Sequence, residues 1–317
     1  MQVASSRKAF GEALCEVGRK NPNVVCIVAD VSSSVMTDFF AREFPERFFN
    51  VGIQEAGMVD LAVGFALGGM IPFVNTFAGL FLRTVEQIRT CVSYAKTNVK
   101  IMGGYAGLSD FKDGPTHHSI MDISVMRSMP DFIVLSPCDA TEIKKLLPLV
   151  AEHDGPCYMR ISRADLPVIF DESHKVEIGK GVVIREGNDV ALVGTGVMVS
   201  RCLEAARILE KEGISCEVVN IHTIKPIDKE LIEKEAEKTG CIVTAEEHSV
   251  IGGLGSSVAE VLCESVPCPL ERVGIADRFT ETGPSFEALL DKWGMAVEDV
   301  VKAAKRALKR KEKEKRR

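Results

Sequence analysis

Across its first 165 residues, the chain alternates between short apolar runs and longer segments with helical periodicity. The runs have the length of strands, and the segments between them are long enough to cross back over a sheet. This alternation predicts parallel strands with crossover helices, and therefore one doubly wound parallel-sheet domain over residues 1–165. The predicted strands are 24–29, 47–51, 71–74, 99–103, 132–135 and 157–161, and helical stretches include 5–20, 55–69 and 141–153.

A second, smaller α/β domain is predicted over residues 187–308, after a linker, 166–186, that carries proline and mixed charge. Its predicted strands are 189–196, 214–220, 240–247 and 270–275. The charged tail, 309–317, is expected to extend the last helix into solvent. The stretch GGLGSS, 252–257, is compatible with an anion seated at a helix start or with a flexible helix entry.

Composition excludes several classes of protein. The net charge of −6 argues against a nucleic-acid or membrane-surface protein, and no apolar run reaches the roughly 18 residues of a membrane helix. The start, MQVASSRKAF, has no apolar signal core, so a cytoplasmic protein is expected. Ten cysteines occur without a CxxC pair, which favours buried reduced thiols over a zinc site.

Polar and aromatic residues follow the carboxyl ends of the predicted strands, where open parallel sheets bind their ligands. They are Asp30 and Ser34, then Glu55, then Phe77 opening a helix that carries Phe81, then Asp113, His117 and His118, and finally Arg163. The second domain offers a sparser set, so the first domain is expected to hold the site.

Each of these residues has a simpler alternative when it is taken alone. Asp30 and Ser34 would also serve as helix caps, and Glu55 as a first-turn acid facing the helix dipole. Phe77 and Phe81 stand four residues apart, as in the core stripe of a helix. The two histidines follow a DGP turn signal and would also suit an exposed loop.

Four motifs taken together resemble transketolase: GIQEAGM, NTFAGLFLRTVEQIR, DGPTHHS and ISRADLP. HTIKPID and AEEHSVIGGLG resemble the C-terminal domain of the same family. The resemblance spans essentially the whole chain and covers the pyrimidine-binding and C-terminal domains. It implies a thiamine diphosphate enzyme that moves a two-carbon ketol unit from a ketose phosphate to an aldose phosphate, as in the pentose phosphate pathway.

The resemblance implies that Glu55 hydrogen-bonds N1′ of the cofactor's aminopyrimidine. A carboxyl in an apolar pocket can stay protonated and donate such a bond, which favours the tautomer that deprotonates thiazolium C2. The thiazolium ring then accepts the electrons released on C–C cleavage. Phe77 and Phe81 match the aromatic wall around the pyrimidine, and Asp30 and Val31 match contacts beside the thiazolium.

Substrate contacts also carry over from the family. Arg7, Ser34, His117 and Arg163 match the positions that hold the sugar phosphate, where guanidinium groups suit phosphate oxygens. Asp113 matches an acid that binds a substrate hydroxyl. The sequence departs from the family pattern at two positions close to these substrate contacts. Tyr105 stands near a place where many relatives carry histidine, and Lys112 replaces the usual acid before DGP.

A partner is implied as well. Full-length relatives bind Mg²⁺ (or Ca²⁺) and the diphosphate through a Gly-Asp-Gly segment in an N-terminal domain, and no GDG occurs here. The chain is therefore expected to be the C-terminal subunit of a split transketolase, with an N-terminal subunit supplying the metal site, in a dimer of heterodimers. Alternatives are the beta subunit of a 2-oxoacid dehydrogenase decarboxylase component, a 1-deoxyxylulose-phosphate synthase fragment, or a non-catalytic scaffold.

Overall fold

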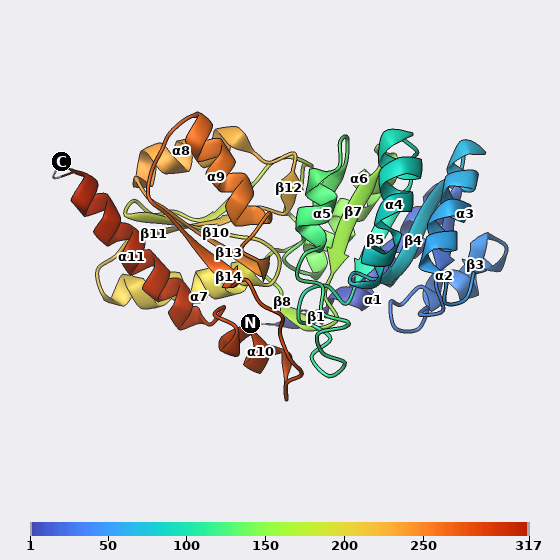
Figure 1. Ribbon diagram of the computed structural model, residues 1–317, viewed down its shortest axis with the longest axis horizontal. Helices are drawn as coiled ribbons and strands as arrows, with labels where there is room; N and C mark the ends of the chain where they lie inside the picture. Colours follow the sequence, from blue (N-terminus) through green and yellow to red (C-terminus); the bar gives the residue numbers. More distant parts are fainter. Residues whose placement is uncertain (1, 316–317) are drawn as a thin grey trace.

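The computed structural model describes residues 2–315 and contains two α/β domains, each built on its own sheet. Figure 1 shows the sheets side by side, with the blue-to-green half of the chain on the right and the yellow-to-red half on the left. The first sheet has seven strands in the order β12-β6-β7-β5-β4-β2-β3. The second has five strands in the order β14-β13-β10-β11-β9. This confirms the predicted two-domain α/β fold.

The strands of the first sheet run parallel except for β12, which pairs antiparallel with β6. The apolar runs of the inner strands are buried on both faces, as expected for a sheet covered by helices on each side, whereas the edge strand β3 is only partly buried. The strands are β2 (Val24–Val28), β3 (Phe48–Asn50), β4 (Ile71–Phe77), β5 (Lys100–Gly104), β6 (Ile133–Leu135), β7 (Cys157–Ile161) and β12 (Thr223–Lys225).

Alternate residues of these strands enter two separate cores. Cys26 of β2 packs under α1 and α6, whereas the next residue, Ile27, packs under α3 and α5. Helices on both faces make the domain doubly wound. The helices of this half are α1 (Ser6–Lys20), α2 (Asp38–Glu43), α3 (Glu55–Leu67), α4 (Val85–Gln87), α5 (Asp122–Ser128) and α6 (Ala140–Glu152), with 3₁₀ turns η1 (Pro45–Arg47) and η2 (Leu80–Thr84) and a π-helical segment η3 (Ile88–Tyr94).

The second domain repeats this construction on a smaller scale, with helices on both faces of its sheet. Only its edge strand β9 runs antiparallel to its neighbour. The strands are β9 (Val182–Arg185), β10 (Val190–Gly194), β11 (Cys216–Asn220), β13 (Ile242–Ser249) and β14 (Leu270–Ile275). The helices are α7 (Met198–Lys211), α8 (Lys229–Thr239), α9 (Leu254–Glu264), α10 (Phe286–Lys292) and α11 (Val297–Lys315).

Two short strands cross the division between the halves that the sequence suggests. Strand β9 lies within 166–186, the segment expected to be a linker, and it completes the second sheet. Strand β12 comes from the second half of the chain and pairs with β6 of the first sheet.

Most cysteine side chains are buried, whereas Cys263 is exposed. The tail continues α11 as far as Lys315, and residues 316–317 lie outside the described part of the chain.

One local expectation needs correction. Phe77 does not open a helix: β4 continues to it because its pairing with β5 extends to Phe77 and Gly104, and the helical turn η2 starts only at Leu80. At the glycine-rich start of α9, for which the sequence left an anion site or a flexible entry open, two of the N–H groups that an anion would need are already occupied. The carboxylate of Glu246 already accepts hydrogen bonds from the N–H groups of Leu254 and Gly255, both at 2.8 Å.

None of the helices in the described range 2–315 is both long and apolar enough to cross a membrane.

Candidate functional site

Four neighbouring parallel strands deliver several of the predicted site residues to one edge of the first sheet. Strands β2, β4, β5 and β7 lie next to one another, so the segments that follow them emerge together. Phe77 ends β4, and Tyr105 follows β5 directly. Ser34 comes from the loop after β2, and Arg163 from the loop after β7.

Arg7 reaches the same edge through a small separate sheet. Strand β1 (Val3–Ser5) pairs antiparallel with β8 (Asp165–Pro167), and Ser5 lies opposite Asp165. The pairing places the first turn of α1 beside the residues that follow β7. Arg7 and Arg163 are therefore neighbours in space although they come from opposite ends of the first domain.

Tyr105 is the centre of this group. Its ring stacks on Phe77 with centroids 4.1 Å apart and an angle of 21° between the planes. The guanidinium carbons of Arg7 and Arg163 lie 5.3 and 5.4 Å from the centre of the Tyr105 ring, within cation–π range. Arg7 Nη1 also donates to the Tyr105 hydroxyl at 3.1 Å and to the Ser34 carbonyl at 3.0 Å.

The backbone of Tyr105 has a φ of 56°, in the left-handed region that a bulky side chain rarely adopts. The residue is 7% exposed, so the surrounding contacts hold the ring in place. His117 lies at the border of the same group, with its ring centroid 6.1 Å from that of Phe77. The structure thus brings together Arg7, Ser34, Phe77, His117 and Arg163.

Asp113 joins the group through Asp110, a buried acid that sequence reasoning missed. Burial and then the neighbouring Asp113 together raise the pKa of Asp110 to about 6, although Arg163 opposes the shift. Arg163 Nη1 lies 3.8 Å from Asp110 Oδ1. The group around Tyr105, called the rim below, therefore holds two arginines and a pair of carboxyl groups. This set can bind both an anion and hydroxyl groups.

Glu55 begins α3 and points inward, since its side chain is only 3% exposed. It is not surrounded by apolar groups alone as expected, because Arg83 Nη1 of η2 lies 3.2 Å from Glu55 Oε2. The Arg83 side chain is 65% exposed, so the cation that covers this carboxyl belongs to the surface and can move without disturbing the core. No sequence spacing pointed to Arg83, because this pairing joins two separate elements.

Asp30 is exposed and has a left-handed φ of 57°. Its Oδ1 accepts a hydrogen bond from Asn50 Nδ2 at 3.1 Å, and its N–H donates to Asn50 Oδ1 at 3.1 Å. This reciprocal pair ties the end of β2 to the end of β3. Val31 follows it in a half-buried position at the same edge.

The two phenylalanines of the expected aromatic wall have different environments. Phe77 is half-buried and faces Tyr105, so one of its faces belongs to the rim. Phe81 is fully buried, with 0% exposure, in the core cluster that contains Ala29, Met58 and Val74. Phe81 therefore packs as a core residue, the alternative that its spacing allowed.

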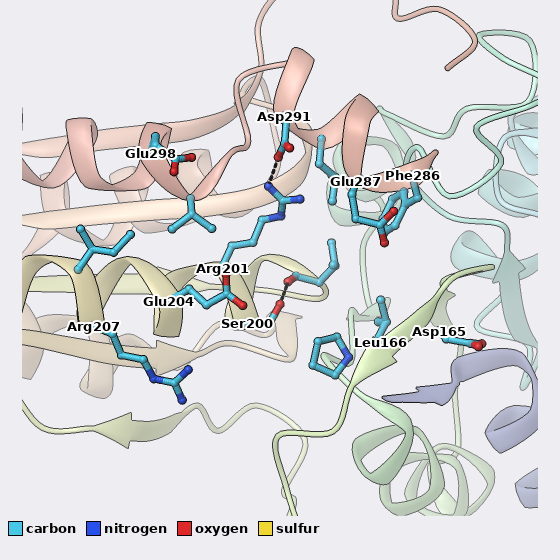
Figure 2. Close-up of a pocket in the computed structure, with 15 residues that line it drawn as sticks. Asp165, Leu166, Ser200, Arg201, Glu204, Arg207, Phe286, Glu287, Asp291 and Glu298 are labelled. Carbon is cyan, nitrogen blue, oxygen red and sulfur yellow. Dashed lines mark hydrogen bonds and ion pairs between the residues drawn. The ribbon is translucent and has the colours of Figure 1, made fainter. Parts of the chain in front are cut away.

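A cavity of about 490 Å³ lies where β8 meets α7, α10 and the start of α11. Figure 2 shows Arg201 pointing to Asp291 among several acidic side chains. The distance from Arg201 Nη1 to Asp291 Oδ1 is 2.5 Å. None of the ten site residues expected from the sequence lines this cavity.

Within residues 2–315, no cluster of three or more His, Cys, Asp or Glu residues has a geometry that could hold a metal ion.

Two family models match the chain over nearly its whole length. The model of the transketolase pyrimidine-binding domain matches residues 2–168, and that of the transketolase C-terminal domain matches residues 179–300. Their match defines a two-domain protein of the thiamine diphosphate type.

Individual relatives agree with the family models. A solved structure titled split gene transketolase, inactive beta4 tetramer, is 44% identical, with a TM-score of 0.90, and the match covers 98% of this chain and 100% of that one. A 6-deoxy-6-sulfo-D-fructose transketolase subunit from Clostridium sp. (strain MSTE9) is 39% identical over 96% of this chain and 95% of its own length. A 1-deoxy-D-xylulose-5-phosphate synthase from Geobacter sulfurreducens is 38% identical over 91% of this chain but only 46% of its own length. The chain belongs to the transketolase family.

Proposed function

We propose that this chain is the C-terminal subunit of a two-component transketolase that transfers a two-carbon ketol unit between sugar phosphates. The observation that carries the proposal is the convergence of Arg7 and Arg163 on Tyr105 at the carboxyl edge of the sheet. Two guanidinium groups held against the same Tyr105 ring suit a phosphate better than a small oxoacid carboxylate alone. The Asp110–Asp113 pair beside them suits sugar hydroxyls.

The family depends on thiamine diphosphate, and the chain's residues fit the pyrimidine end of that cofactor. Glu55 is a buried acid at the same sheet edge, covered by a surface arginine that can move aside. Glu55 is proposed to hold the aminopyrimidine, with Phe77, Asp30 and Val31 as further contacts and Phe81 as packing behind them. When bound, the cofactor supplies the thiazolium carbon that attacks the ketose and the ring that accepts electrons. The chain's own residues orient it and exclude water.

The partner and the domain limits belong to the same proposal. A separate N-terminal subunit supplies the Mg²⁺ and diphosphate site, and the relative titled as a split gene product supports this arrangement. The proposed divisions are a pyrimidine-binding domain over 1–165, a linker over 166–186 whose last residues form β9 of the second sheet, a C-terminal domain over 187–308 and a tail over 309–317. The substrates are sugar phosphates bound by Arg7, Ser34, Asp113, His117 and Arg163.

The test is reconstitution with the product of the neighbouring reading frame. The two chains together, with thiamine diphosphate and Mg²⁺, should transfer a ketol unit from xylulose phosphate to ribose phosphate, and each chain alone should be inactive. Turnover by this chain alone would contradict the two-component proposal. A parallel assay with pyruvate and glyceraldehyde phosphate distinguishes the synthase activity named for the Geobacter sulfurreducens relative. Recovery of a lipoyl-bearing partner would favour the dehydrogenase subunit instead.

A further inference from the structure

The loop between β5 and α5, residues 105–121, carries much of the proposed substrate rim but is held from the other domain. In Figure 1 it descends at the junction of the two sheets, close to α10. The rim residues on this loop are Tyr105, Asp110, Asp113 and His117.

Backbone bonds join this loop to the second domain at two points. The N–H of Gly283 donates to the Phe111 carbonyl at 3.0 Å, and the N–H of Ser249 donates to the Ile120 carbonyl at 2.9 Å. These bonds hold the middle and the end of the loop. Its beginning, which follows Tyr105, is tied by backbone bonds within the first domain, from the Ala106 N–H to the Ile161 carbonyl at 3.2 Å and between Gly107 and Ser119 at 3.1 and 2.9 Å. The second domain reaches this part of the loop through a side chain.

A side chain of β13 holds the beginning. Glu247 is 4% exposed, and its Oε1 accepts a hydrogen bond from the Leu108 N–H at 2.5 Å. The backbone of Gly107 passes so close to this carboxyl that a Cβ there would lie 2.1–2.4 Å from its atoms. Gly107 also has a φ of +64°, so glycine is required for both space and conformation.

Three charged side chains from different elements face the Glu247 carboxyl: Arg160 of β7, Asp122 of α5 and Arg201 of α7. Arg160 is already engaged, with Nε donating to Asp122 Oδ2 at 2.8 Å and Nη2 donating to the Glu247 backbone carbonyl at 3.1 Å. Burial raises the pKa of Glu247 to about 7, and the arginines oppose this shift. The direct partner of the Glu247 carboxyl is therefore the loop itself.

We infer that Glu247 is a positioning residue, through which the C-terminal domain sets the conformation of the 105–121 loop and hence the place of Tyr105. The structural part of this inference stands on the Glu247–Leu108 bond and the Gly107 approach. Its consequence for substrate binding rests on the proposed function.

The neighbouring Glu246 provides a matched control. Both acids are buried on β13, but the Glu246 carboxyl accepts hydrogen bonds from the start of α9 and lies 3.6 Å from His248 Nδ1, and both of these partners are in the second domain. Hydrogen exchange of peptides spanning 105–121 should become about tenfold faster or more in full-length Glu247→Ala and only slightly faster in Glu247→Gln, whose amide oxygen can still accept a bond from the Leu108 N–H. Glu246→Gln should leave this segment unchanged. Unchanged loop exchange in both Glu247 variants, or the same acceleration in Glu246→Gln, would overturn the inference.

A double variant separates loss of the bond from general damage. Gly107→Ala should loosen the loop strongly in the native background, because the new Cβ collides with the Glu247 carboxyl. In a Glu247→Ala background the collision is absent and only the backbone strain remains, so the additional effect of Gly107→Ala should be several-fold smaller. Equal effects of Gly107→Ala in the two backgrounds would contradict the close approach on which the inference depends.

Kinetics of the reconstituted enzyme give the functional readout. Glu247→Gln should raise KM for the phosphorylated substrate more than it lowers kcat, and the pH profile of kcat/KM should lose a transition near pH 7. A profile identical to that of the native enzyme would remove the functional part of the inference. If no ketol transfer is found at all, the proposed function fails, whereas the exchange measurements still decide the role of Glu247.

Discussion

Arg7 Nη1 donates a hydrogen bond to the Tyr105 hydroxyl at 3.1 Å, and the two residues are 98 positions apart in the chain. The contact joins the first turn of α1 to the residue that follows β5. The hydrogen bond holds the Arg7 guanidinium, one cation of the proposed phosphate site, against Tyr105, which departs from the family pattern. Substrate choice is therefore expected to depend on Tyr105.

Tyr105→Phe should keep the stacking on Phe77 and lose the bond from Arg7. We expect KM for the phosphorylated substrate to rise about tenfold, since the lost bond involves a charged donor, with a smaller change in kcat. Steady-state kinetics of the reconstituted enzyme measure this. An unchanged KM would show that the hydroxyl does not help to place Arg7 for substrate.

Arg7→Gln and Arg163→Gln should each raise KM for a phosphorylated ketose by about 10- to 100-fold, because each removes a charge-assisted contact. The corresponding unphosphorylated ketose serves as the control. Its KM, which is expected to be high in the native enzyme, should hardly change in either variant. Equal losses for both substrates would mean that the arginines shape the site without binding phosphate.

Glu55→Gln should reduce kcat about 100-fold or more, because an amide cannot take both protonation states of the carboxyl. The control is Glu86→Gln, which alters an exposed ion pair with Arg89 in the segment after η2. Thiamine diphosphate binding, measured by calorimetry on the reconstituted pair, reports whether the loss lies in binding or in turnover. Full activity in Glu55→Gln would favour a scaffold role for the chain.

Phe81→Ala should destabilise the chain by about 3–5 kcal/mol, because it opens a cavity in the core that contains Met58. Phe77→Ala should cost less stability, since that ring is half-buried, and should affect ligand binding more. Chemical denaturation of both variants tests the distinction. A stability loss as large in Phe77→Ala as in Phe81→Ala would contradict it.

Glu247→Gln should change the pH dependence of stability. The pKa of Glu247 in the folded chain, about 7, is raised above its ordinary value of 4.5, so the folded state holds this proton more tightly than the unfolded state. The native chain should therefore lose stability as the pH rises from about 4.5 to 7, by up to about 3 kcal/mol relative to the glutamine variant.

Denaturant midpoints at pH 5, 6, 7 and 8 measure this difference. Parallel curves for the two proteins across that range would show that Glu247 keeps its ordinary pKa.

Much of the fold was predictable because strand and helix periodicities are local. The runs 157–161 and 270–275 were placed at the bounds that β7 and β14 have, since both are apolar runs of strand length. The short strands β9 and β12 were not anticipated. They have little periodicity of their own and exist because a sheet edge in another part of the chain pairs with them.

The candidate site also contains some residues that the sequence could place and others that it could not. Residues that follow strand ends, such as Glu55 and Arg163, could be placed at one edge from the rule for parallel sheets. Asp110, Arg83 and Glu247 could not, because each depends on a partner from another element. Their local sequence gives no sign of that partner.

The sequence by itself determined the two α/β domains, the edge at which polar residues collect, and the motifs shared with the transketolase family. These follow from periodicity and residue order, which act over a few neighbouring positions. Only the tertiary structure decided that Arg7 and Arg163 meet on Tyr105, that Phe81 lies in the core, and that Glu247 supports a loop of the other domain. Each of these depends on contacts between segments far apart in the chain, which are set only when the sheets have formed and packed together.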